Sequence, residues 1–98
     1  MLEFTIRDAF NIEETKMVIK AKTSKKAINT FIKNKFRKLT YGLDNKGKVA
    51  ATLIGEVNTG GRIQRVVYKF RLRNNGYDLR KVLTSHDNLE GKTDEIKH

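Results

Sequence analysis

The segment RIQRVVYKFRLR (residues 62–73) constrains the fold more than any other part of the chain. From position 66 onward, apolar residues alternate with basic ones: Val66, Tyr68, Phe70 and Leu72. Because successive side chains of a strand point to opposite faces, this period of two predicts a half-buried β-strand. Its other face would carry a row of cations that is broken only by Val67: Arg65, Lys69, Arg71 and Arg73.

The same alternation predicts strands at residues 2–7 and 16–22, and residues 49–57 are also strand-like. Between them, apolar residues recur at spacings of three and four up to about position 39: Ile28, Phe31, Ile32, Phe36 and Leu39. That spacing is typical of an amphipathic helix. The hydroxyl of Thr23 or Ser24 can cap its first turn.

These elements predict an α+β fold: a small two-layer domain in which one long helix packs on one face of an antiparallel sheet, in the order β-β-α-β-β. The segment DLRKVL (78–83) is compatible with a short C-terminal helix that starts at Asp78. The segment RKLTYGL (37–43) could either end the long helix or form an extra strand that pairs with residues 48–54 across the turn DNKG. Residues 58–61 (NTGG) predict a hairpin loop.

Ninety-eight residues suffice for one domain, which we assign to residues 1–85, with a polar tail at 86–98. No apolar run approaches the roughly 18 residues of a membrane span, so we expect no membrane association. The chain has no cysteine, which excludes disulfides and thiolate metal sites and suits the cytoplasm.

The net charge of +10 is concentrated in two blocks. Residues 16–43 hold nine cations and no acid, and residues 57–77 hold five cations and no acid. Blocks of positive charge on a small domain attract polyanions, of which nucleic acid is the foremost, although an acidic protein is also a candidate partner.

The predicted strands offer the first candidate binding surface. Cations of the 62–73 strand would recur every ~6.7 Å on one face, a spacing suited to following a phosphate backbone. Lys16, Lys20 and Lys22 would sit together with them, on the side of the sheet away from the helix. Polar open faces and protective charges on edge strands are the simpler explanation. Seven cations without an acid exceed that need, so we favour binding here.

The helix offers a second surface. At about 100° per residue, Lys26, Lys33 and Arg37 form a stripe opposite the apolar face, so they would point to solvent on the far side of the domain. A solvated helix face is the simpler explanation, although the stripe lacks the acids that often relieve such repulsion.

The glycine-rich loops with Lys46, Lys48 and Arg62 fit simple hairpin turns better than a phosphate-binding loop. Base readout would need exposed aromatic side chains. Most aromatic residues, Phe36 included, fall on predicted core faces. Phe10, Tyr41 and Tyr77 lie near loops and are the free candidates.

The sequence shows no metal-ligand cluster, cofactor motif or triad pattern, so we expect no enzyme, no cofactor and no metal. It predicts a nucleic-acid-binding protein that contacts phosphates with little base specificity, whether DNA or RNA, single- or double-stranded. One alternative is an interaction module, either an inhibitor or an adaptor, that docks an acidic protein. A less favoured one is a metal-free ribonuclease of the toxin type, which would use Arg71, Arg73, Tyr77 and His86 near one end of the last strand.

Overall fold

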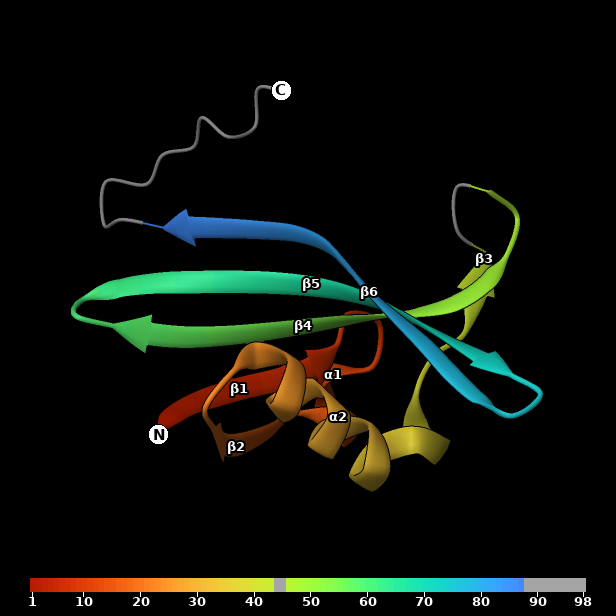
Figure 1. The fold of residues 1–98 in the computed structure, drawn as a ribbon, viewed down its shortest axis with the longest axis horizontal. Helices are drawn as coiled ribbons and strands as arrows, with labels where there is room; N and C mark the ends of the chain where they lie inside the picture. The colour runs from red at the N-terminus through yellow and green to blue at the C-terminus, as the bar shows by residue number, and fades with distance from the viewer. Residues whose placement is uncertain (44–45, 88–98) are drawn as a thin grey trace.

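The structure of the protein is a computed structural model that describes residues 1–43 and 46–87 (Figure 1). Its elements in chain order are β1 (Leu2–Asp8), α1 (Ile12–Thr15), β2 (Met17–Ala21), α2 (Ser24–Lys35), the 3₁₀ turn η1 (Phe36–Lys38), β3 (Gly42–Leu43), β4 (Val49–Thr59), β5 (Arg62–Arg73) and β6 (Gly76–Asp87). Among the described helices, none combines the length and the apolar character that a membrane crossing requires.

The described strands form one antiparallel sheet in the order β2-β1-β4-β5-β6, with the short β3 beside β4. Strands β4, β5 and β6 are the longest strands, and Figure 1 shows them twisting strongly towards the end that carries β3. The hairpin between β4 and β5 turns through Gly60 and Gly61, both of which have positive φ. This confirms the hairpin predicted at NTGG.

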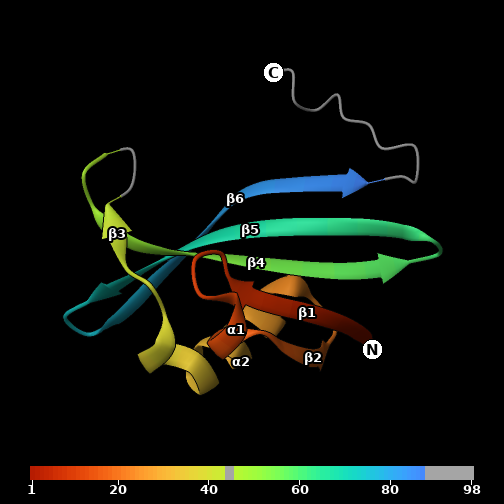
Figure 2. The same cartoon turned by 180° about the vertical axis from the view of Figure 1, so that it is seen from behind.

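Helix α2 covers one face of the sheet, mainly over β2 and β1 (Figure 1). The side chain of Thr23 accepts a hydrogen bond from the backbone N–H of Lys26, which confirms the predicted cap. Ile28 and Phe31 are buried against apolar side chains of the central strands, including Leu53. Figure 2 shows the opposite face, where strands lie in front of the helix. We call this uncovered side the open face.

The predicted fold class, an α+β domain with one long helix, is wrong because the structure is mostly strand. The described residues contain six strands, whereas α2 has 12 residues and η1 adds three, so the domain is β-rich and has no long helix. The helix ends at Lys35 rather than near Leu39. Beyond it, buried Leu39 turns towards the core in an extended conformation, and Phe36 is 41% exposed instead of buried.

The second correction concerns residues 78–83, which belong to β6 and not to a helix. The two-residue turn Asn74–Asn75 joins β5 to β6, because Arg73 pairs with Gly76, which has a φ of 142°. Strand β6 then contains a bulge, because Val67 pairs with Leu83 while Tyr68 pairs with Lys81. The extra residue produces a helix-like apolar spacing within a strand.

Two further predictions concern the ends of segments. Within the segment 37–43 only Gly42 and Leu43 form the extra strand, which pairs with Ala50 and Val49, whereas Arg37 and Lys38 belong to the 3₁₀ turn after α2. Strand β6 runs to Asp87, two residues into the predicted tail 86–98. The rest of that tail lies outside the described residues.

Candidate functional site

The cations of β5 lie on the open face, as predicted. Val66, Tyr68 and Phe70 are buried under the helix side, so the alternate positions point away from it. The second predicted row, on β2, lies on the same face because Ile19 and Ala21 are buried. Lys20 and Lys22 are exposed there.

The two rows are not adjacent, contrary to the expectation that they would sit together. Strands β1 and β4 lie between β2 and β5, so the rows are three strand spacings, or about 14 Å, apart. The intervening strands also bring acids, since Glu3 is paired in register with Lys20 and Glu56 with Arg65. One continuous basic face across the sheet is therefore absent from the described strands.

Glu56 forms the centre of an ion-pair cluster in the middle of the open face. Its carboxylate lies 2.7 Å from Nε of Arg65 and 3.5 Å from a guanidinium nitrogen of Arg7. All three side chains are partly buried, so the cluster is better placed to hold β1, β4 and β5 in register than to bind a ligand. Of the predicted site residues on β5, Arg65 is thus the one whose ion pair serves the fold.

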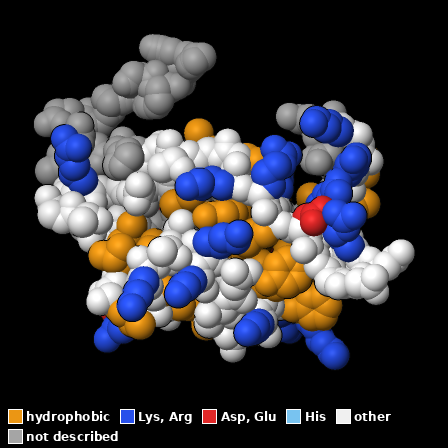
Figure 3. All heavy atoms as spheres, viewed as in Figure 1, with side chains coloured by type: hydrophobic (Ala, Val, Ile, Leu, Met, Phe, Trp, Pro, Cys, Tyr) orange, Lys and Arg blue, Asp and Glu red, His pale blue; other side chains and the backbone are white. Residues whose placement is uncertain are grey.

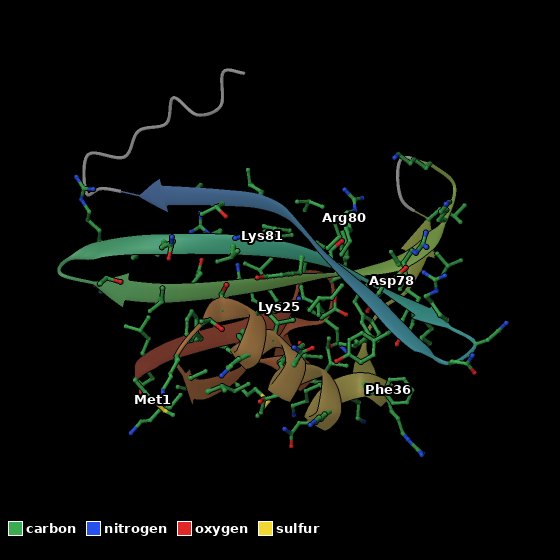
Figure 4. The ribbon with its side chains drawn as sticks, viewed as in Figure 1. Met1, Lys25, Phe36, Asp78, Arg80 and Lys81 are labelled. Carbon is green, nitrogen blue, oxygen red and sulfur yellow. The ribbon has the colours of Figure 1, made fainter. Side chains whose placement is uncertain are left out.

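The other β5 cations meet at the twisted end of the sheet. There, residues of β5, β6 and the loop before β4 line a pocket of about 390 Å³: Lys46, Lys48, Lys69, Arg71, Asp78, Leu79 and Arg80. We call it the cationic pocket. Figure 3 shows the basic side chains gathered around one acidic side chain at this end, and Figure 4 labels Asp78 and Arg80 there.

The strand register brings like charges together in this pocket. Lys69 and Arg80 are directly opposite each other on β5 and β6. Lys69 donates a hydrogen bond to Oγ1 of Thr52 at 2.7 Å, and Arg80 has no ion pair with any acid that the structure describes. Like charges that face each other across two strands are destabilising. A bound anion would relieve that repulsion.

Asp78 is the acid of the pocket and lies opposite Arg71 in the register. Its carboxylate is 3.4 Å from Arg71 and 2.5 Å from Arg73, so it joins two of the predicted site residues. Both pairs are partly exposed and contribute little stability. They do fix the directions of the two guanidinium groups at the pocket's edge.

The predicted helix stripe is a separate surface. Lys26, Lys33 and Arg37 are exposed, as expected for the side of α2 and η1 that faces solvent. None of them has an ion pair among the described residues. The three best-formed hollows of the described residues are all lined by other side chains.

Sequence reasoning missed three cations of the pocket. Arg80 falls in the segment with helical spacing, and Lys46 and Lys48 fit ordinary turns. The signal that could have placed Arg80 was the pair Asn74–Asn75, because a two-residue hairpin turn fixes the register of β6 against β5. The positions of Lys46 and Lys48 depend on how the sheet twists, which the local sequence does not encode.

The residue set of the ribonuclease alternative is not brought together. Tyr77 lies on the helix side of the sheet, where its ring packs on Phe70, whereas Arg71 points to the open face. His86 pairs with Gln64, eight positions along β6 from Asp78, which corresponds to about 26 Å of strand. The expected grouping near one end of the strand is therefore wrong.

One ionisable side chain near the site has a shifted pKa. Tyr41, which precedes β3, is partly buried beside Phe70 and near buried Asp8. Burial and, to a smaller extent, the negative charge of Asp8 raise the pKa of its phenol above 10.0. Tyr41 is therefore neutral at physiological pH.

Comparisons with protein-family models, with curated proteins and with solved structures each find no match to this chain, so its function has to be inferred from the site itself.

Proposed function

We propose that this chain is a non-enzymatic protein that binds nucleic acid through the phosphate backbone, with little base specificity, and that the cationic pocket is its main contact surface. Five of the seven residues lining the pocket are Lys or Arg, and one is an acid.

The observation that carries the proposal is the pairing of Lys69 with Arg80. A register that sets two cations opposite each other costs stability in the free protein. An anionic ligand bound between the two side chains would supply the missing negative charge. Phosphate suits this role because lysine and arginine both bind its oxygens through charge-assisted hydrogen bonds.

The rest of the surface supports the same proposal more weakly. The net charge of +10 attracts a polyanion from a distance and raises the rate of encounter. Lys20 and Lys22, the helix stripe and Arg73 add to that field without forming a pocket of their own. We also propose the cytoplasm as the compartment, because a chain without cysteine suits a reducing environment.

The test is equilibrium binding of the purified protein to fluorescent single- and double-stranded DNA and RNA of equal length. If the pocket makes about four phosphate contacts with a single strand, the logarithm of affinity should fall with the logarithm of salt with a slope of about −3. Affinity should then drop on the order of 60-fold between about 50 and about 200 mM salt. Undetectable binding to all four ligands at the lower salt would refute the proposal.

A further inference from the structure

A second hollow lies at the tip of the β5–β6 hairpin, next to the cationic pocket. It has a volume of about 370 Å³ and is lined by the last residue of β5, the turn and the start of β6: Arg73, Asn74, Asn75, Gly76 and Tyr77. The two-residue turn accounts for Asn74 and Asn75, because asparagine is common in hairpin turns. It does not require an aromatic residue at position 77.

Tyr77 is held in a fixed position by two contacts. Its ring centroid lies 5.0 Å from that of Phe70 at an interplanar angle of 58°, and its hydroxyl donates a hydrogen bond of 2.6 Å to Oδ1 of Asn29 in α2. The residue is nevertheless 39% exposed. An aromatic ring that is fixed by its neighbours and open to solvent loses little conformational freedom when a planar group stacks on it.

The surrounding groups match the chemistry of a nucleobase. The carboxamides of Asn74 and Asn75 can donate and accept hydrogen bonds, and the guanidinium of Arg73 can donate or stack. A base has a flat aromatic face for Tyr77 and polar edges for these side chains. The hollow therefore offers stacking that tolerates any base, together with adaptable polar contacts.

An ion pair between Arg73 and Asp78 links the linings of the two hollows. Arg73 lines the tip, Asp78 lines the cationic pocket, and their side chains are ion-paired at 2.5 Å. Tyr77 and Asp78 are consecutive, so they point to opposite faces of the sheet. Strand β6 is paired on one side only among the described strands, which leaves its other edge open to a chain that crosses from one face to the other.

We propose that the hairpin tip binds one nucleobase on Tyr77 while the neighbouring phosphates occupy the cationic pocket, so that the preferred ligand is single-stranded nucleic acid. This inference rests on the proposed function and adds the class of ligand to it. In a duplex the bases are paired and stacked inside the helix, so they cannot reach Tyr77. Stacking is insensitive to base identity, which agrees with little base specificity.

The test compares three ligands of equal length at one salt concentration: a single strand, the same strand with abasic sites, and a duplex. We expect the unmodified protein to bind the intact strand about five-fold or more tightly than the abasic strand, since loss of one stacking contact typically has that effect. Tyr77→Leu should reduce binding of the intact strand by a similar factor and leave binding of the abasic strand unchanged.

Two further variants separate stacking from folding. Tyr77→Phe keeps the ring and its packing on Phe70 but loses the hydrogen bond to Asn29, so it should bind the intact strand more tightly than Tyr77→Leu does. Phe10→Leu removes an aromatic side chain that is 73% exposed on the connection after β1, and it should have no effect. Equal affinity of the unmodified protein for intact and abasic strands would overturn the inference even if Tyr77→Leu failed to fold. In that case the proposed function would still stand, whereas failure to bind either strand would contradict both.

Discussion

Replacement of Asp8 by alanine tests how much the hydrogen bonds of its carboxylate stabilise the contact between the β1–α1 connection and the segment that leads to β3. Asp8 has no exposed surface, and its carboxylate accepts hydrogen bonds from the backbone N–H groups of Phe10 at 2.8 Å and Thr40 at 2.5 Å. Its own N–H donates to Oγ1 of Thr15 at 2.9 Å. Only the two bonds to the carboxylate are lost in the alanine variant.

The expected loss of stability follows from those two bonds. A hydrogen bond to a charged group contributes about 1.5–3 kcal/mol, and removal of the carboxylate also ends the unfavourable burial of its charge. Taking the lower limit for each bond, we expect Asp8→Ala to lower the free energy of unfolding by about 3 kcal/mol. For a domain of this size that corresponds to a fall in Tm of roughly 12–24 °C. Asp8→Asn keeps one carbonyl oxygen and should lose about half as much.

The assay is urea denaturation followed by circular dichroism, with midpoint and slope fitted for each variant. Glu13→Ala is the matched control, because it removes the same charge from an exposed side chain of α1 and should change stability by no more than about 0.5 kcal/mol. If Asp8→Ala were as stable as Glu13→Ala, the carboxylate would not fasten these segments and the reasoning would be refuted.

Three further predictions follow from single residues. Gly55→Ala should fold with unchanged or slightly higher stability in thermal denaturation, because a Cβ there would meet its nearest side-chain atoms at 3.6 and 3.8 Å, which is ordinary contact; a loss above about 1 kcal/mol would contradict this. Because the pKa of Tyr41 is raised on folding, its contribution to folding stability is complete below pH 10.0 and is lost as pH rises through the folded-state pKa. Above pH 10.0, the midpoint of denaturation should therefore fall less steeply with pH in Tyr41→Phe than in the unmodified protein. Asp78→Asn should tighten oligonucleotide binding several-fold at low salt, since it removes the acid that competes for Arg71; weaker binding would show that Asp78 is needed to orient the guanidinium.

Local sequence patterns predicted the elements whose residues alternate or recur without interruption. Strand β5 is the clearest example, because its apolar face is continuous from Val66 to Phe70 and both neighbours pair with it in regular register as far as the bulge. The cap at Thr23 and the turn at Gly60 were also predictable, since each depends on a residue and its immediate neighbours.

The errors arose where a long-range contact overrides the local pattern. The bulge in β6 sets Leu79, Val82 and Leu83 at helical spacing within a strand. Phe36 continues the apolar period of α2, yet the chain leaves the helix before it, because Thr40 is bound to Asp8.

In the candidate site, too, the local pattern predicted some residues and long-range strand pairing determines the others. The cations of β5 were evident from the sequence, whereas their partner in the pocket, Arg80, depends on the pairing of β5 with β6. The separation of Lys20 and Lys22 from β5 likewise depends on strand order, because β1 and β4 are inserted between them. Strand order is set by the whole fold and not by either segment alone.

The most direct test of the central claim compares two double variants that lose the same charge. Lys69→Gln with Arg80→Gln removes the opposed cations of the pocket, and Lys26→Gln with Lys33→Gln removes two cations of the helix stripe. We expect the pocket variant to fold at least as stably as the unmodified protein, since it relieves repulsion, yet to bind a single strand on the order of 25-fold more weakly at about 0.1 M salt, with a salt slope shallower by about 1.4. The helix variant should change affinity much less. An equal or larger loss in the helix variant would contradict the assignment of binding to the cationic pocket.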